Sequence, residues 1–198
     1  MSFFDHFEKS KSTKLGEFLS KCSRKKEFNF INKYISNKKT LKILEIGPGK
    51  GFLAKIFMSR GFANYYGIEP NSKMNRHLKK LGLKDVKQYS VPPVNEENQE
   101  FDLIIASAVY EHMPSPVQSY EFIKEASRVL KKDGLLYLFC PDLLEWKWDF
   151  FNVDYTHNNP TTIKRTIQIL ENNSFEVLDK AYLYGCFNYF TGWVISKI

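Results

Sequence analysis

The feature that most constrains the fold is a strand-to-helix turn with three closely spaced glycines, LEIGPGKGFLAKIFMSRG, residues 44–61. Before the turn, an apolar run over residues 41–46 has the length and composition of a strand buried on both faces. Glycines at such a turn leave the backbone open to a ligand, because no side chain covers the N–H groups at the helix start. The apolar residues that recur at helical spacing after the turn are Phe52, Leu53, Ile56 and Phe57.

From residue 41 onward, apolar runs of strand length alternate with helical patterns. This alternation predicts an α/β protein with a mostly parallel sheet and helices on both faces, which is a three-layer, Rossmann-like, doubly wound arrangement. The expected strands are residues 41–46, 64–69, 86–90, 101–107 and 135–140, and the expected helices are 51–60, 72–81 and 116–131.

Capping residues predict where several helices begin and end. Asn71 or Ser72 can cap the helix at 72–81, and Gly82 can end it. We expect Asp133-Gly134 to stop the helix that begins at residue 116. A further helix is expected from Thr161 or Thr162 to Asn173, followed by a strand from Phe175 to Tyr184, and the pattern leaves the tail GWVISKI open between strand and helix.

The first 40 residues differ in charge from the rest of the chain. They hold ten Lys and Arg against four Asp and Glu, which gives +6, whereas the remainder holds 19 against 18, which gives +1. Two apolar patches predict two helices here, so we divide the chain into a helical extension, 1–40, and a catalytic domain, 41–198. The basic charge is typical either of a solvated helix face or of a surface that meets an anionic substrate.

The start of the chain is charged by its fifth residue and has no apolar run of signal-peptide or membrane-spanning length, so we expect a cytoplasmic protein. Its three cysteines, Cys22, Cys140 and Cys186, are too widely separated to indicate a disulfide framework or a metal-binding knuckle. We interpret them as reduced thiols.

The stretch Glu45-Ile46-Gly47-Pro48-Gly49-Lys50-Gly51 resembles the first motif of class I S-adenosylmethionine-dependent methyltransferases, an acidic residue followed by Gly-x-Gly-x-Gly. A dinucleotide-binding turn would instead read Gly-x-Gly-x-x-Gly. Residues 101–142 are similar to the family's fourth strand, following helix and fifth strand. The resemblance covers about residues 41–180 and implies S-adenosylmethionine as cofactor, with S-adenosylhomocysteine as product.

The resemblance implies a set of cofactor-binding residues at the carboxyl ends of the strands. Glu69 lies about 20 residues after the turn, where an acid can accept both hydroxyls of a ribose. The family usually carries an acid near the adenine after the third strand, but this chain offers only Tyr89 and Ser90 there. Met74 can pack near the adenine, but its position favours ordinary packing on a helix face. The expected cofactor-binding residues are Glu45, Gly47, Gly49, Glu69, Met74, Ser90, Ala106 and Ser107.

Candidates for the chemistry follow the fourth and fifth strands. Residues 152–162, NVDYTHNNPTT, resemble a segment found in a subset of these enzymes, many of which act on surface glycans and their precursors. We expect His157 to accept a proton, with Asp154 orienting its ring, and Asp142 as a third catalytic candidate. The other reading of His157 is that it caps the following helix or forms a hydrogen bond with the loop backbone. Residues expected on the acceptor side are Trp146, Tyr155 and His112. A divalent ion held by His157, Asp142 and Asp154 is another possibility for these three residues, but no ligand spacing is diagnostic, so we predict no metal.

The leading interpretation is a methyltransferase that acts on a hydroxyl of a sugar or of a phosphorylated, glycan-related small molecule. The basic charge of residues 1–40 indicates an anionic acceptor, and no nucleic-acid partner is expected because the catalytic domain is nearly neutral and has no basic stripe. The alternative is N-methylation of a small amine or amino-alcohol phosphate. An RNA or protein methyltransferase and a non-catalytic binding module fit the sequence less well.

Overall fold

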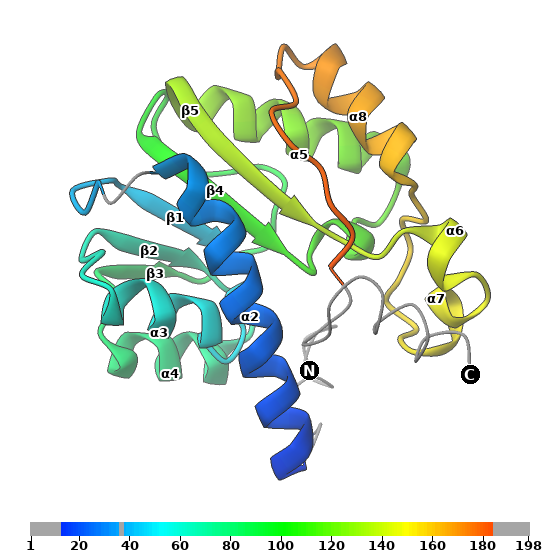
Figure 1. Ribbon diagram of the computed structural model, residues 1–198. Helices are drawn as coiled ribbons and strands as arrows, with labels where there is room; N and C mark the ends of the chain where they lie inside the picture. Colours follow the sequence, from blue (N-terminus) through cyan, green and yellow to red (C-terminus); the bar gives the residue numbers. More distant parts are fainter. Residues whose placement is uncertain (1–12, 36–37, 184–198) are drawn as a thin grey trace. The chain divides into compact units, whose positions relative to one another are not determined.

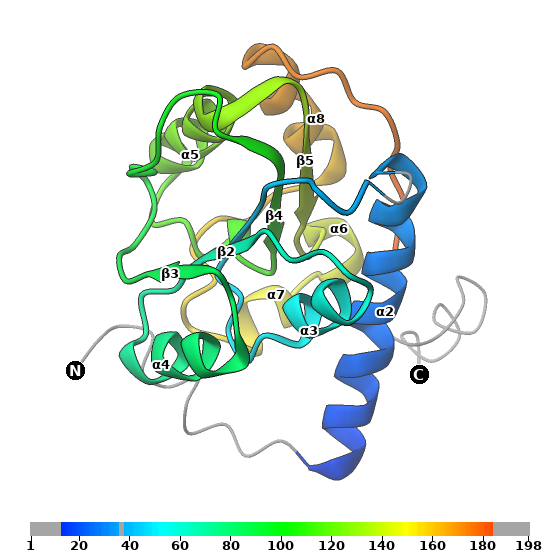
Figure 2. The same ribbon diagram turned by 90° about the vertical axis from the view of Figure 1, so that its left-hand side faces the viewer.

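The computed structural model describes residues 13–35 and 38–183 of the 198-residue chain. Its strands form a five-stranded sheet in the order β3-β2-β1-β4-β5 (Figures 1 and 2), and β2 with β3, β1 with β4, and β4 with β5 pair in parallel. Strand order reverses between β1 and β4, as in doubly wound sheets, so the predicted α/β class is confirmed. The strands are β1 Ile43–Ile46, β2 Tyr65–Ile68, β3 Asp85–Lys87, β4 Phe101–Ser107 and β5 Leu130–Phe139.

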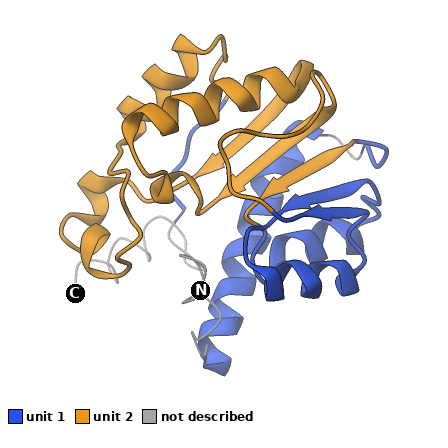
Figure 3. Ribbon diagram, turned by 180° about the vertical axis from the view of Figure 1, so that it is seen from behind, with its two compact units in different colours: residues 1–41, 48–88, 179–198 blue, residues 42–47, 89–178 orange. Residues whose placement is uncertain are grey.

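The described residues fall into two compact units (Figure 3). Unit 1 takes its described residues from 1–41, 48–88 and 179–198, and unit 2 consists of residues 42–47 and 89–178. Strands β2 and β3 therefore belong to unit 1, whereas β1, β4 and β5 belong to unit 2. The sequence predicts a different division, between a helical extension and a catalytic domain at residue 40, and that boundary stays a prediction.

Unit 1 is built around an aromatic cluster. The helices are α2 Lys14–Ile35, α3 Phe52–Ser59 and α4 Ser72–Leu81, and α2 packs along α3. Phe28 of α2 meets Phe57 of α3 edge to face, with 4.9 Å between ring centroids, and Phe57 also contacts Phe62 and Tyr65. These four rings are almost fully buried, so they anchor α2 to the helix that follows the glycine turn.

Helix α4 has the bounds that its caps predict. The side chain of Asn71 accepts hydrogen bonds from the N–H groups of Lys73 and Met74, both at 3.0 Å. At the other end, Gly82 adopts a left-handed conformation with φ of 95°. Both ends are fixed by local contacts, and the observed helix Ser72–Leu81 matches the prediction.

Unit 2 carries the remaining elements, η1 Tyr110–His112, α5 Pro116–Val129, α6 Leu143–Trp146, α7 Asp149–Asn152 and α8 Ile163–Asn172. Strand β4 has its predicted bounds, and almost all of its residues are buried between β1 and β5. The side chain of Ser115 caps α5 by accepting from the Gln118 N–H at 3.3 Å. Thr162 caps α8 in the same way, as the sequence predicted.

Three predictions about elements are wrong. The two helices expected before residue 40 are, over the described residues, one continuous helix of 22 residues, α2. Asp133-Gly134 does not end a helix, because α5 stops at Val129 and the pair lies inside an irregular part of β5, where Asp133 has a positive φ of 63°. The strand expected from residue 175 is absent from the described residues 175–183, and the tail lies outside the described part.

The described part of the chain has no helix with the length and apolar character needed to cross a membrane. Cys22 and Cys140 are free thiols, as predicted, and Cys186 lies outside the described residues.

Candidate functional site

The glycines of the glycine turn, Gly47, Gly49 and Gly51, all have positive φ, between 54° and 70°. A Cβ at Gly47 would lie 2.6 Å from the Val109 side chain, and one at Gly51 would lie 2.7 and 2.8 Å from leucines of α4. A Cβ at Gly49 would meet no atom within 4 Å. Packing therefore explains the missing side chains at Gly47 and Gly51, whereas the space beside Gly49 is open to a ligand.

Glu69 is buried at the end of β2 and holds the turn in place. Its Oε2 accepts the N–H of Gly49 at 3.0 Å, and its Oε1 accepts the N–H of Asn71 at 2.9 Å. Burial raises the pKa of the Glu69 carboxyl, and these two backbone hydrogen bonds oppose that rise. Each carboxylate oxygen accepts more than one hydrogen bond, so both can still receive the hydroxyls of a ribose.

The other residues expected at the cofactor differ in placement. In unit 2, Glu45 is buried on β1, and Ala106 and Ser107 are buried at the carboxyl end of β4. Ser90 is exposed in the segment after β3. In unit 1, Met74 is half-buried in the first turn of α4, where its N–H donates to Asn71. The structure thus gives buried positions to three of these five residues.

A second group of polar side chains lies within unit 2. His112 ends the short helix η1, and His157 follows α7, yet their ring centroids are only 5.0 Å apart. We call these two residues the histidine pair. Asn159 joins their segments, because its N–H donates to the Glu111 carbonyl at 3.0 Å and its side chain donates to the Tyr110 carbonyl at 2.9 Å.

Hydrogen bonds fix which nitrogen of each ring carries the proton. Nδ1 of His157 lies 2.6 Å from the Phe150 carbonyl oxygen, which can only accept, so this nitrogen is the donor. The hydroxyl of Thr156 donates to the Asp154 carboxylate at 2.7 Å and therefore accepts from Nδ1 of His112 at 2.8 Å. In the neutral rings, Nε2 of both histidines is the unprotonated nitrogen.

The hydrogen bonds among the residues expected beside the acceptor differ from the prediction. We expected Asp154 to orient His157, but Nδ1 of His157 donates to the Phe150 carbonyl, which is the hydrogen bond to the loop backbone that the other reading of this residue expected. Asp154 instead accepts hydrogen bonds from both the N–H and the hydroxyl of Thr156. The same hydroxyl accepts a hydrogen bond from His112. Thr156 is fully buried, and the only hint of its role in the sequence is its position between Asp154 and His157.

Asp142 joins the starts of two helices. Its Oδ1 accepts the N–H of Leu144 in α6 at 2.8 Å, and its Oδ2 accepts the N–H of Ile163 in α8 at 2.9 Å. These bonds give Asp142 a capping role that explains its burial without any part in the chemistry. A catalytic role for Asp142 stays a prediction.

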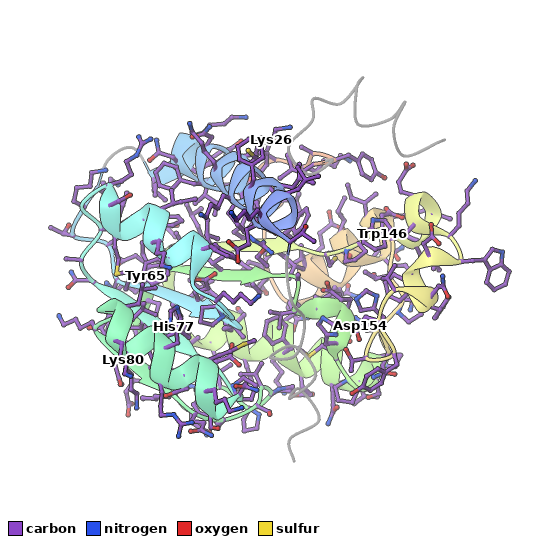
Figure 4. All side chains as sticks on the ribbon, turned by 90° about the horizontal axis from the view of Figure 1, so that it is seen from below. Lys26, Tyr65, His77, Lys80, Trp146 and Asp154 are labelled. Carbon is purple, nitrogen blue, oxygen red and sulfur yellow. The ribbon has the colours of Figure 1, made fainter. Side chains whose placement is uncertain are left out.

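The aromatic residues expected beside the acceptor are exposed. Trp146 ends α6 and Tyr155 precedes Thr156, with exposed fractions of 42% and 65%, and Trp148 is exposed to 84%. Figure 4 shows Trp146 and Asp154 on the part of unit 2 that contains α6 and α7. Their exposed fractions leave part of each ring accessible to solvent.

Comparisons with known proteins agree with the motif. The methyltransferase domain family matches residues 9–180 of the chain. Over 105 residues the chain is 32% identical to the ubiquinone biosynthesis O-methyltransferase of Pelagibacter ubique (strain HTCC1062). That match spans 50% of this chain and 42% of the relative, which is less than half of the relative's length.

Solved structures show the same fold. The YcgJ protein from Bacillus subtilis has a TM-score of 0.62 at 19% identity, with 74% of this chain and 66% of that chain covered. A SAM-dependent methyltransferase from Archaeoglobus fulgidus has a TM-score of 0.61 at 17% identity, with 88% and 85% covered. At these identities the likeness establishes the fold alone.

Proposed function

Because the chain belongs to the methyltransferase domain family, we propose that it transfers the methyl group of S-adenosylmethionine to a hydroxyl group of a small molecule. Membership of this family supports S-adenosylmethionine as the methyl donor, and the fold agrees with that assignment. The choice of a hydroxyl is supported by the histidine pair and by the relative from Pelagibacter ubique, which is named as an O-methyltransferase.

The cofactor supplies an electrophilic methyl group on a positively charged sulfur. In unit 1, the open space beside Gly49 and the remaining acceptor capacity of Glu69 fit its amino-acid part and its ribose. For Glu45, Ala106 and Ser107 of unit 2, the assignment to the cofactor rests on the sequence resemblance alone. The chain's task toward the cofactor is to hold and orient it, since methyl transfer is an in-line displacement that depends on alignment.

The observation that carries the proposal is the fixed tautomer of the histidine pair. A hydroxyl must lose its proton as it accepts a methyl group, whereas a neutral amine needs little help from a base. Nε2 of His157 has no hydrogen-bond partner among the described residues, and its Nδ1 is held by Phe150. An acceptor hydroxyl can therefore donate a hydrogen bond to this nitrogen.

For the acceptor we propose a sugar or a phosphorylated, glycan-related compound. The segment at residues 152–162 supports this class through the resemblance, and the exposed rings of Trp146 and Tyr155 offer surfaces on which a sugar can stack. The net charge of +6 over residues 1–40 supports an anionic acceptor. N-methylation of an amine or amino-alcohol phosphate is the alternative.

The proposal is tested with three panels of acceptors, namely sugar phosphates and nucleotide-sugars, phenols, and amines. Release of S-adenosylhomocysteine identifies the accepted compounds, and an isotope-labelled methyl group in the product identifies the methylated atom. We expect an oxygen-linked methyl group on a sugar compound. Turnover of phenols alone would support O-methylation but contradict the assignment of a glycan-related acceptor. A nitrogen-linked methyl group would contradict the proposal as a whole.

A further inference from the structure

Glu111, His112 and His157 come together as a possible set of metal ligands within unit 2. One side-chain ligand atom of each of the three residues lies within 4.8 Å of the others. Glu111 is buried, whereas both rings are partly accessible. The three residues thus offer one buried carboxylate and two partly accessible imidazoles as ligands.

The hydrogen bonds around the rings are those of an outer coordination shell. Metal-binding histidines nearly always donate their second ring N–H to a carbonyl or a carboxylate-linked group, which fixes the tautomer and makes the other nitrogen a better ligand. His157 donates to the Phe150 carbonyl, and His112 donates to Thr156, whose hydroxyl is bonded to the Asp154 carboxylate. Both rings meet this condition independently.

The cluster is also fixed in space by the backbone. His112 and His157 are 45 positions apart in the sequence. The segment that carries Thr156, His157 and Asn159 is tied to η1 through the hydrogen bonds of Asn159 to the Tyr110 and Glu111 carbonyls. Asn159 and Thr156 are buried, so the three candidate ligands are held near one another by internal contacts.

We propose that Glu111, His112 and His157 bind one divalent transition-metal ion, and that zinc is the ion that suits them best. Two imidazoles and one carboxylate form a known catalytic zinc set, and magnesium prefers oxygen ligands. Ligand atoms on a tetrahedral zinc stand about 3.3 Å apart, given bonds of about 2.0–2.1 Å. The ligand atoms of the three side chains must therefore move closer to one another when the ion binds.

The catalytic consequence rests on the proposed function. With three protein ligands, the ion keeps a position for the acceptor oxygen and lowers the pKa of that hydroxyl. The O–H bond breaks and its proton passes to solvent, an O–C bond forms to the methyl carbon, and the C–S bond breaks with its electron pair staying on sulfur. In this state Nε2 of each histidine serves as a ligand, and the ion replaces the imidazole as the group that assists proton loss.

Metal binding is measured on the full chain after treatment with a chelator and without cofactor or acceptor. We expect one zinc per chain by calorimetry and by metal analysis, and visible absorption bands when cobalt(II) is added in its place. His157→Gln should weaken zinc binding by more than about 100-fold, and Thr156→Val, which removes an outer-shell partner, by about 10–100-fold. The matched control is His77→Gln, because His77 is exposed on α4 in unit 1 (Figure 4).

Two results would overturn the inference, namely no zinc on the unmodified chain, or an equal loss in His77→Gln and His157→Gln. Circular dichroism checks each variant, and if His157→Gln does not fold, the unmodified chain and Thr156→Val decide. Calorimetry of S-adenosylhomocysteine with the zinc-free chain separates the two proposals. Cofactor binding without zinc binding removes the metal site alone, whereas zinc binding without cofactor binding removes the methyltransferase function.

Discussion

The glycine turn and the histidine pair are held in place by different kinds of contact. At the turn, the backbone itself makes the site. Gly49 has a positive φ, and its N–H donates a hydrogen bond to the buried carboxylate of Glu69. At the histidine pair, side chains make the site, and the hydrogen bond that His112 donates to Thr156 joins residues 44 positions apart. Changes at the turn should therefore remove a binding surface, whereas changes at the pair should alter chemistry and leave cofactor binding intact.

The largest effect is expected from Gly49→Val. Its side chain would occupy the open space beside the turn, and its backbone would resist a φ of 54°, which costs about 1–3 kcal/mol. We expect loss of measurable S-adenosylmethionine binding in calorimetry, with a folded protein by circular dichroism.

Gly82→Val is the matched control for that substitution. Gly82 also has a positive φ, of 95°, and a Cβ there would meet no atom within 4 Å. It caps α4 and has no assigned part in cofactor binding. Equal losses of cofactor affinity in the two variants would mean that backbone strain, and not a filled binding surface, explains the effect.

The next largest effect is expected from His157→Gln, which removes the nitrogen that faces the acceptor. Loss of a group that assists proton removal lowers kcat by about 10²–10⁴-fold. We expect this loss on the accepted hydroxyl compound under saturating cofactor, with His77→Gln retaining full activity. An unchanged kcat would exclude His157 from the chemistry and favour the amine acceptor.

A smaller effect is expected from Glu69→Gln. The substitution keeps the shape of the side chain but replaces one acceptor oxygen by a donor, which breaks one of the bonds to Gly49 and Asn71. A hydrogen bond to a charged group contributes about 1.5–3 kcal/mol, so cofactor affinity should fall by about 10–100-fold. Unchanged affinity in calorimetry would show that the carboxylate is only a structural part of the turn.

The smallest effect is expected from pH. Burial raises the pKa of Glu69, so this carboxyl gains a proton at a higher pH than an exposed glutamate does. The protonated form accepts fewer hydrogen bonds, so cofactor affinity should be full above the raised pKa and should decline as pH falls through it. The same titration with Glu69→Gln should lack this decline, and an identical decline in both proteins would assign it to another group.

Local contacts explain which parts of the fold the sequence predicts well. Helix α4 is bounded by Asn71 and Gly82, which act within a few residues of its ends. The single helix α2 was not foreseen because charged residues separate its two apolar patches, and the packing of Phe28 on α3 decides the outcome. The strand expected from residue 175 fails over the described residues, because an alternating pattern does not supply a partner for the backbone.

In the candidate site, too, the features set by local sequence are predictable, and those set by the packing of distant segments are not. The glycine turn and Glu69 are predictable because φ, chain direction and a spacing of about 20 residues are all local properties of the sequence. The hydrogen bond that His112 donates to Thr156 depends on how two distant segments pack, whereas the one that Thr156 donates to Asp154 is local. No spacing rule places Glu111 beside His157, so this cluster emerges only from the folded chain.

The central claim is that the turn binds the cofactor and that the histidine pair acts on the acceptor. It is tested most directly by calorimetry of S-adenosylhomocysteine with the unmodified chain, Gly49→Val and His157→Gln side by side. We predict one site per chain in the unmodified protein, no measurable binding in Gly49→Val, and unchanged affinity in His157→Gln. Retained affinity in Gly49→Val, or loss of affinity in a folded His157→Gln, would contradict this division of roles.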